Sequence, residues 1–193
     1  MSYVGSPFVY GIAAAGANCK AVSRRSVVQT GNFLAWMGEN SFFVYDGVVR
    51  EIPCDVHDYV FDNLNVPGRA ASWGGHNSNF NEIWWGFPSG TSQYTPNKYV
   101  IWNYGTNVWS IGELDRGCWI DQGVFDYPIA GDSSGFIYEH ESQVLNNSPN
   151  LGNSIPFCQS GPIEIGNGDR VMQVNQIIPD EEAATLPGVT ISF

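Results

Sequence analysis

Residues 32–53 read NFLAWMGENSFFVYDGVVREIP, and this stretch decides the fold class. It contains three short apolar runs, at 33–37, 41–45 and 48–52. Gly38-Glu39-Asn40 separates the first two runs, and Asp46-Gly47, a dipeptide typical of two-residue hairpin turns, separates the last two. The stretch therefore predicts three antiparallel strands in a meander. A turn leading into a strand at 24–29 comes before them.

Two later regions repeat this pattern. The region 80–114 predicts strands at 82–87, 98–104 and 108–112, with a polar loop at 88–97 and a turn at 105–107. A third unit begins at Trp119 and predicts strands at 124–130 and 136–141, joined by the turn GDSSG at 131–135. Further strands are predicted from short apolar or alternating runs, at 155–157, 163–165 and 171–178.

One helix is predicted between the first two units, at about 55–64. Asp55 is a suitable N-cap, and four apolar residues follow at helical spacing. These are Val56, Tyr59, Val60 and Leu64. Pro67-Gly68 is expected to end the helix, whose apolar side would cover the edge of a sheet.

The units resemble one another. WMGENSFFVYDG at 36–47 and IAGDSSGFIYEHE at 129–141 share an apolar run, a polar turn and an aromatic strand, and the unit starts lie roughly 45 residues apart. We therefore predict an all-β fold of β-propeller-like antiparallel meanders with one short helix, as a single domain over 1–193 with units at about 26–53, 80–116 and 119–160. A β-sandwich is the alternative. The apolar run at 189–193 lacks a following partner, which predicts an incomplete propeller from a longer polypeptide.

Composition narrows the class of partner. Of 193 residues, 14% are charged, against about 25% in ordinary domains, and 14% are aromatic. The net charge is −11, with 9 acidic and 7 basic residues in 1–116 but 10 acidic and 1 basic in 117–193. Such a surface does not attract phosphates, so free nucleic-acid binding is not expected. Like charge would let a polyanion pass without adhering, although solubility alone also explains an acidic surface.

The sequence predicts no zinc site, no membrane span and no signal peptide. The four cysteines (Cys19, Cys54, Cys118 and Cys158) form no C-x-x-C pair, so we predict buried free thiols and no structural zinc. No run approaches the ~20 apolar residues of a membrane span. VYGIAAAGA at 9–17 lacks a basic start and is not interpreted as a signal peptide.

The three histidines show no metal-ligand spacing. His57 follows Cys54 and precedes Asp58 in the predicted helix, where we expect it to face solvent. His76 is the second of the three in the sequence. His140 lies between Glu139 and Glu141, and strand alternation would place the two glutamates on one face and His140 on the other.

Enzymatic motifs are weak. Carboxylates such as Glu82, Asp121 and Glu139 are candidates for a glycosidase pair, but any acidic protein offers them. Ser133 fits G-x-S-x-G, yet a strand follows it instead of a helix, so we interpret GDSSG as a hairpin turn. Four tryptophans are candidates for stacking sugars or bases, but are more typical of a core: Trp84, Trp85, Trp102 and Trp109.

Four strings carry a family resemblance: MGENSFFVYDGVVREIPCDVHDYVFDNLN (37–65), FNEIWWGFPS (80–89), NKYVIWNYGTNVWSIGELDRGCWIDQGVF (97–125) and PIAGDSSGFIYEHE (128–141). They resemble the tail hub proteins of short-tailed bacteriophages, also described as packaged-DNA stabilisation or tail accessory factors. The combination of FxVYDGxVREIPC, EIWWxxPS and IYEHE is the specific part. The resemblance covers about residues 3–193 and is strongest over 32–141.

The resemblance implies a virion structural protein, neither an enzyme nor a cofactor binder. Family members look like β-propellers in a homo-oligomeric ring below the portal or adaptor ring, assembled in the bacterial cytoplasm with other tail proteins. The ring extends the DNA channel and retains the genome, and double-stranded DNA passes without specific binding. No membrane is involved. We hypothesise that Asp132, Glu139 and Glu141 lie at the channel or an interface. The alternatives are a carbohydrate-binding module or adhesin with aromatic platforms, and a secreted glycoside hydrolase fragment.

Overall fold

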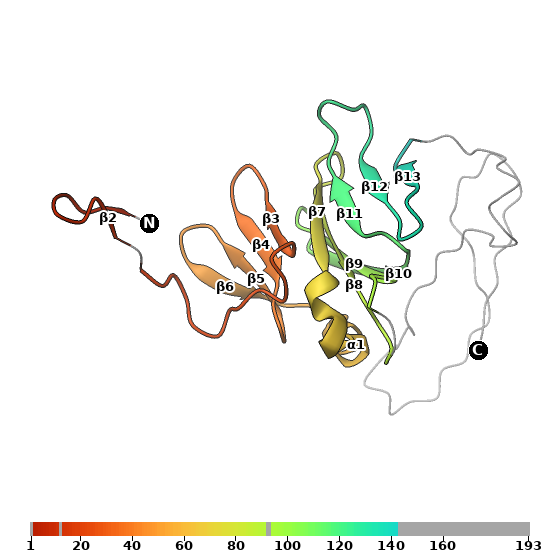
Figure 1. The fold of residues 1–193 in the computed structure, drawn as a ribbon, viewed down its shortest axis with the longest axis horizontal. Coiled ribbons are helices and arrows are strands. Elements are labelled where there is room, and N and C mark those ends of the chain that lie inside the picture. The colour runs from red at the N-terminus through yellow and green to blue at the C-terminus, as the bar shows by residue number, and fades with distance from the viewer. Residues whose placement is uncertain (1, 12, 92–93, 143–193) are drawn as a thin grey trace, which may run out of the picture. The chain divides into compact units, whose positions relative to one another are not determined.

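A computed structural model describes residues 2–11, 13–91 and 94–142, which belong to one compact unit. This part of the chain is mostly antiparallel β-sheet, with one α-helix and one 3-10 helix (Figure 1). The predicted all-β class is confirmed at this level. The strands predicted at 155–157, 163–165 and 171–178 and the run at 189–193 lie outside the described residues.

The first sheet has four strands in the order β3-β4-β5-β6. They are β3 (Val27–Gln29), β4 (Leu34–Met37), β5 (Phe42–Tyr45) and β6 (Val49–Ile52), each antiparallel to the next. The predicted strands are therefore confirmed to within about a residue. The predicted two-residue turn is wrong, because Tyr45 pairs with Val49 and leaves Asp46, Gly47 and Val48 in the loop. Gly47 has φ 121°, which a residue with a side chain rarely adopts.

The second sheet also has four strands, in the order β10-β9-β8-β7. They are β7 (Trp73–Asn77), β8 (Glu82–Phe87), β9 (Lys98–Asn103) and β10 (Val108–Glu113). The last three match predicted strands. The sheet nevertheless begins before residue 80, with β7, a strand that was not predicted. Its residues, WGGHN, have two glycines and no apolar run, so they give no strand signal.

The helix α1 (His57–Asn63) lies between these sheets in the chain. Its N-cap is Val56 and no side chain caps it, so the predicted N-cap at Asp55 is wrong. Val60 is fully buried, and the Phe61 ring packs 5.4 Å from that of Phe42 in the interior strand β5, so the apolar side of the helix packs on the first sheet and not on a sheet edge. Pro67 does not end α1, which has already ended; it lies in the 3-10 helix η1 (Val66–Ala71).

The third sheet has three described strands in the order β11-β12-β13. They are β11 (Cys118–Ile120), β12 (Ile129–Gly131) and β13 (Ile137–Glu139). The strand predicted at 124–130 is wrong over most of its length, since only Ile129 and Ala130 are in β12. The turn predicted at 131–135 is confirmed. A separate two-stranded hairpin near the N-terminus joins β1 (Ser2–Tyr3) to β2 (Tyr10–Gly11).

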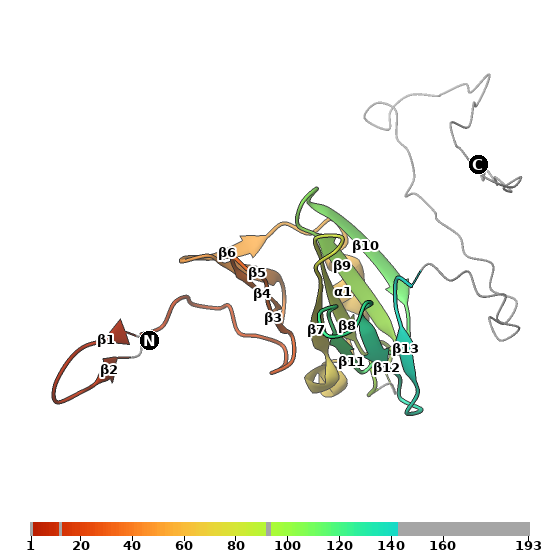
Figure 2. The same ribbon diagram turned by 90° about the horizontal axis from the view of Figure 1, so that it is seen from above.

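The sheets meet through their first strands. Arg25, just before β3, forms a parallel bridge with Trp73 of β7, and the Gly74 N–H donates to the Arg25 carbonyl at 2.7 Å. On the other side of β7, the Trp119 indole of β11 donates to the His76 carbonyl at 2.8 Å. Both ribbon views show β3, β7 and β11 side by side (Figures 1 and 2).

Two adjacent glycines of β7 make this close packing achievable. A Cβ on Gly74 would lie 2.5 Å from a methyl carbon of Val28, and one on Gly75 would lie 2.4 Å from the Trp119 ring. Neighbouring strand residues point to opposite faces, so each glycine opens one face of β7. The described sheets follow one another in this way but do not close into a ring.

Candidate functional site

The four tryptophans considered as ligand platforms are buried. Trp85 is fully inaccessible, and Trp84, Trp102 and Trp109 are each 8% exposed. Trp85 and Trp109 pack against Phe42 with ring centres 5.0 and 4.8 Å away. These contacts form the first junction, between the first and second sheets. The core interpretation of the tryptophans is confirmed, and none of the four presents an open stacking face.

The second junction, between the second and third sheets, is an aromatic stack. The Trp84 ring lies 4.9 Å from Tyr99 and 5.0 Å from Trp119, and Trp119 lies 6.1 Å from Trp73. Interplanar angles of 23°, 19° and 8° make these contacts face to face. Gly86 makes room for Trp73, since a Cβ there would lie 2.2 Å from the indole nitrogen. Aromatic stacking of this kind strengthens the packing beyond the area buried.

A cation and a histidine lie at the edge of the second junction. Arg116 Nε donates to His140 Nε2 at 3.0 Å, and its guanidinium lies 4.0 Å from the centre of the Tyr138 ring. Burial lowers the pKa of His140 to about 4, and the Arg116 charge adds to that shift. His140 is therefore neutral at pH 7, with its proton on Nδ1 because Nε2 accepts. The strand ends at Glu139 and Glu141 has φ 60°, so the alternation assumed for these residues does not extend to Glu141.

A second histidine links the same two sheets. His76 Nδ1 lies 3.2 Å from an Asp121 oxygen, and His76 Nε2 lies 3.0 Å from the Tyr104 hydroxyl. Asp121 also accepts from the backbone N–H of Ser78 at 3.2 Å. Burial, and then the Asp121 charge, raise the pKa of Tyr104. This acid–histidine–tyrosine chain holds the segment after β11 to the β7–β8 turn. Sequence reasoning missed it, because no motif connects positions so far apart in the chain.

The three hypothesised channel or interface residues all lie on or beside the β12–β13 hairpin. Asp132 accepts from the N–H groups of Ser134 and Phe136 at 2.9 and 2.8 Å, and from the Tyr138 hydroxyl at 3.0 Å. Burial acts to raise the pKa of Asp132, but these hydrogen bonds outweigh it and lower that pKa. Asp132 thus shapes the turn, whereas Glu139 and Glu141 are exposed.

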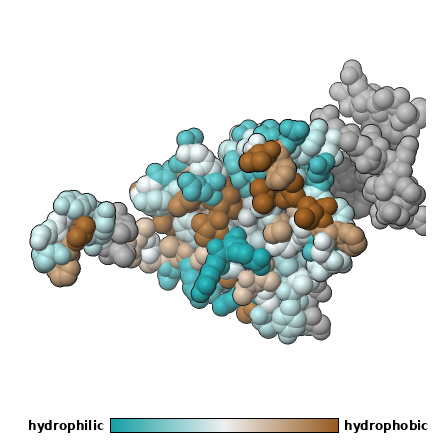
Figure 3. Space-filling view, turned by 45° about the horizontal axis from the view of Figure 1, so that its top comes forward, coloured by the Kyte–Doolittle hydropathy of each residue, from teal (hydrophilic) through white to brown (hydrophobic). Residues whose placement is uncertain are grey.

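The third sheet also exposes large apolar side chains. Figure 3 shows that apolar side chains reach the molecular surface in patches instead of singly. Seven exposed hydrophobic residues belong to the third sheet and its loops: Ile120, Val124, Phe125, Tyr127, Phe136, Ile137 and Tyr138. Large apolar side chains exposed together on one sheet and its loops are a feature of interaction sites.

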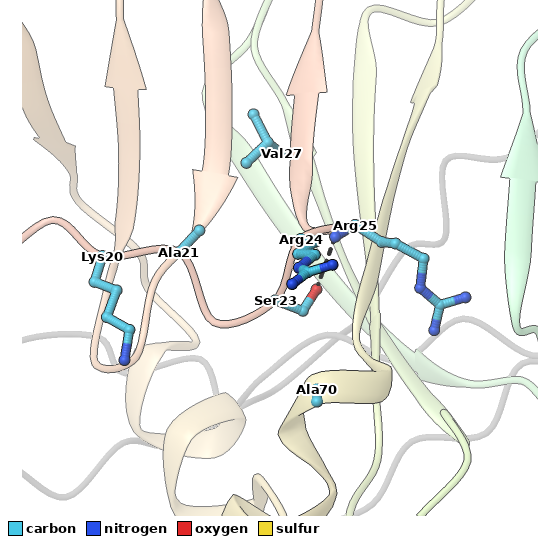
Figure 4. Close-up of a pocket in the computed structure, with 7 residues that line it drawn as sticks. All are labelled: Lys20, Ala21, Ser23, Arg24, Arg25, Val27 and Ala70. Carbon is cyan, nitrogen blue, oxygen red and sulfur yellow. Dashed lines mark hydrogen bonds between the residues drawn. The ribbon is translucent and has the colours of Figure 1, made fainter. Parts of the chain in front are cut away.

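The first sheet bears a basic cavity of about 630 Å³, drawn in Figure 4. Its lining includes Lys20, Arg24 and Arg25, together with Val27 and small residues. The Arg25 guanidinium donates to the carbonyls of Ala71 and Gly117, and Lys20 pairs with Glu39 at 2.8 Å. The Lys20 hydrogen bond lowers the pKa of Glu39. Arg24-Arg25 is the one adjacent basic pair in the sequence, and by itself it indicates only a turn.

A smaller cavity of about 330 Å³ opens between the first and second sheets. Three partly or largely buried aromatic residues line it: Phe33, Trp102 and Tyr104. Its charged lining comes from Asp46, Arg50 and Glu51, of which Asp46 and Arg50 form an ion pair. Apolar walls with a few polar groups at one side are typical of small-molecule sites.

The glycosidase candidates have structural partners. Glu82 accepts from the Trp84 indole at 3.0 Å, Asp121 binds His76, and Glu139 is exposed on β13. Ser133 lies in the β12–β13 turn and donates to Asp115, which agrees with the hairpin interpretation.

The described residues contain no cluster suited to binding a metal ion, and their cysteines are unpaired. Within the described ranges, no group of three His, Cys, Asp or Glu residues is placed to hold a metal ion. Cys19, Cys54 and Cys118 are free thiols as predicted, but none is fully buried: Cys19 and Cys54 are partly buried and Cys118 is exposed. Cys158 lies outside the described residues. Burial raises the pKa of Cys54 to about 11. His57 is partly exposed and bonded to Asp58 and to the Asn40 carbonyl, and the Asp58 hydrogen bond raises its pKa.

Comparison with known proteins assigns the chain to no family. No family model and no curated protein sequence matches this chain. Among the residues that the structure covers, no helix has the length and apolar character needed to span a bilayer.

Proposed function

We propose that this protein is a structural component of a bacteriophage tail, a hub or nozzle subunit that forms a ring below the portal and helps to retain packaged DNA. The observation that carries the proposal is the succession of antiparallel meander sheets that meet through their first strands, β3, β7 and β11. Blades of a β-propeller are arranged in this manner. It is also the fold implied by the resemblance to tail hub proteins, and we propose that closure into a propeller occurs in the assembled protein.

The distribution of charge supports the proposed role. Residues 117–193 carry 10 acidic residues against 1 basic residue. Glu139 and Glu141 are exposed on or beside the third sheet. An acidic wall repels phosphates, so DNA can move along it without adhering. The proposed protein acts through protein–protein contacts and passes DNA without specific binding.

The proposed role is tested in particles. Virions produced by the genome that encodes this protein should contain it in multiple copies, as measured by quantitative mass spectrometry of gradient-purified particles. Disruption of its gene should give heads that package DNA and then lose it, seen as empty heads by electron microscopy. A protein absent from purified particles, or full-headed infectious particles without it, would refute the role.

A second candidate function is carbohydrate binding, favoured by the smaller cavity alone. Its volume of about 330 Å³ suits a single sugar ring, with Phe33 and Tyr104 offering ring surface and Arg50 and Asp46 offering hydrogen bonds. The buried tryptophans do not contribute open platforms. Binding on a glycan array that is lost in Arg50→Ala, but retained in the remote control Arg24→Ala, would favour this function. No binding at millimolar sugar would exclude it.

A further inference from the structure

The hairpin of β1 and β2, labelled in Figure 2, has apolar side chains on both of its faces. Tyr3 pairs with Tyr10, and their rings meet edge to face with centres 6.2 Å apart. Next along the hairpin, the Val4 N–H donates to the Val9 carbonyl at 3.2 Å. Because successive strand residues point to opposite sides, the tyrosines belong to one face and the valines to the other.

The apolar side chains of this hairpin are exposed. Its five large apolar residues are each 55–75% exposed: Tyr3, Val4, Phe8, Val9 and Tyr10. Contact of such side chains with water is unfavourable, and a two-stranded hairpin by itself is only marginally stable. The hairpin would therefore gain stability from nonpolar surroundings.

The hairpin also lacks charge. Residues 1–19 contain no Asp, Glu, Lys, Arg or His, in a chain whose net charge is −11. Residues 83–97 lack charge as well, but there Trp85 and Phe87 are fully buried in the core. A folded protein surface would cover one face of the hairpin and leave the other apolar face in water. An uncharged segment that is apolar on both faces is better suited to a nonpolar medium that surrounds it.

The size of the hairpin argues against a second copy of this chain as its partner. A specific protein–protein interface takes roughly 20–30 residues on each side. The described hairpin, residues 2–11, has ten. Insertion into the surface layer of a lipid bilayer needs no matching surface, because its strength scales with the apolar area that is buried.

We propose that this hairpin inserts into the interfacial layer of an electrically neutral lipid bilayer. Tyrosine suits that layer, because its hydroxyl group stays hydrated while the ring enters the acyl chains. The two unpaired strand edges need hydration as well, which keeps the hairpin shallow. Four residues per strand reach about 13 Å, far short of the ~30 Å hydrocarbon core. The inference goes beyond the proposed tail role and departs from the expectation that no membrane is involved.

The charge of the whole protein sets which lipids are favoured. A net charge of −11 is repelled by anionic headgroups, and salt screens this repulsion. At low salt, binding should therefore be tighter to phosphatidylcholine than to an equal mixture of phosphatidylcholine and phosphatidylglycerol. The difference should shrink as the salt concentration rises. Tighter binding to the anionic mixture would contradict the proposal.

The test is flotation of the full-length protein with vesicles of phosphatidylcholine. The wild type should float with the vesicles, and Phe8→Ser should lower the partition coefficient about tenfold. Phe8→Leu, which keeps an apolar side chain, should retain most of the binding. Phe136→Ser is the matched control, because it removes a 64% exposed phenylalanine from beside the β12–β13 turn, and it should leave binding unchanged. Equal effects of Phe8→Ser and Phe136→Ser would overturn the inference.

Two further variants test whether both faces are immersed. Tyr3→Ser and Val9→Ser change opposite faces, and each should weaken flotation. Val124→Ser, which changes a side chain that is 97% exposed outside the hairpin, should not. Loss of binding from one face alone would overturn the proposed immersion. Hydrogen exchange on vesicles should slow over residues 2–11 and stay unchanged in the first sheet.

The remaining outcomes identify other partners for the hairpin. A wild type that does not float at millimolar lipid would overturn the proposal. If such a protein forms oligomers that Phe8→Ser dissociates, the hairpin binds a second copy instead. Circular dichroism confirms that the sheets of each variant are folded. Incorporation into particles is measured separately, so the tail role and the lipid contact can fail independently.

Discussion

The two junctions of the second sheet are built differently. In the first junction, Phe42 and Trp85 are fully inaccessible and their rings meet at tilted angles within an apolar core. In the second junction, Trp84 and Trp119 stack face to face, and polar groups close the edge. Arg116 binds His140 there, and Asp121 binds His76.

One strand, β7, packs against both neighbouring sheets. β7 uses Gly74 to accept the first sheet and Gly75 to accept Trp119 of the third. The stability of the first junction comes from apolar surface removed from water. This contribution does not change with pH. The second junction depends in part on a neutral histidine and on hydrogen bonds, so its strength should vary with pH.

Removal of a tryptophan should distinguish the junctions most clearly. Trp85→Ala leaves a large cavity and orphans the Ser26 carbonyl that accepts from the indole at 2.9 Å. We expect a loss of about 3–5 kcal/mol in the free energy of unfolding, measured by urea denaturation. Trp84→Ala is the matched change at the second junction and should cost less, because that ring lies nearer the surface. An equal or larger cost for Trp84→Ala would reverse this ranking.

Acid should weaken the second junction through His140. Its folded pKa of about 4 lies below the unfolded value of about 6.5, so only the unfolded chain takes up a proton between these pH values. The stabilisation is complete above pH ~6.5 and is lost as the pH falls toward ~4. Urea midpoints across this window should show it.

Two histidine variants test whether His140 causes the loss of stability in acid. His140→Gln should flatten the loss of stability between pH ~6.5 and ~4. His57→Gln should change the slope in the opposite sense, because the hydrogen bond to Asp58 raises the pKa of His57. That group stabilises the fold at low pH, and its contribution disappears as the pH rises through its folded pKa. Identical pH profiles for wild type and His140→Gln would refute the assignment.

The paired glycines offer a smaller and directional test. Gly74→Ala would press against Val28, and Gly75→Ala would press against Trp119. Each should cost about 1–3 kcal/mol by overpacking. Gly75→Ala should also shift the tryptophan fluorescence more, because it displaces Trp119. Gly31→Ala is the control, since nothing lies within 4 Å of its added Cβ. If Gly75→Ala leaves the free energy of unfolding unchanged, the third sheet is free to move away from β7.

The smallest expected effect is at Asp121. Asp121→Ala removes the acceptor for the Ser78 N–H and the partner of His76. A loss of about 1–2 kcal/mol is expected. Hydrogen exchange should quicken at Ser78 but not in the first sheet. Asp126→Ala, an exposed change a few residues away, should leave both readouts unchanged.

Much of the fold was predictable because strands with apolar runs carry a local signal. β4, β5, β8, β9 and β10 all contain such runs, and polar turn residues separate them. β7 was not predictable from local sequence. Its two glycines are needed because side chains of the neighbouring sheets pack closely on each of its faces. The helix start was also misjudged, because Asp55 fits a cap by type while the backbone turns one residue later.

The candidate sites show the same division. Asp132, Glu139 and Glu141 were selected from sequence, but only the structure separates Asp132, which holds a turn, from the exposed Glu139. The His140–Arg116 and His76–Asp121 contacts join residues 24 and 45 positions apart, and no local pattern encodes them.

The sequence alone therefore determined the β-rich class, the positions of most strands and turns, and the uneven charge, because these depend on neighbouring residues. Only the packing of the sheets settles which tryptophans are buried, which face of each sheet stays open, and which acids are exposed. Those features depend on contacts between distant segments, which form only when the sheets pack.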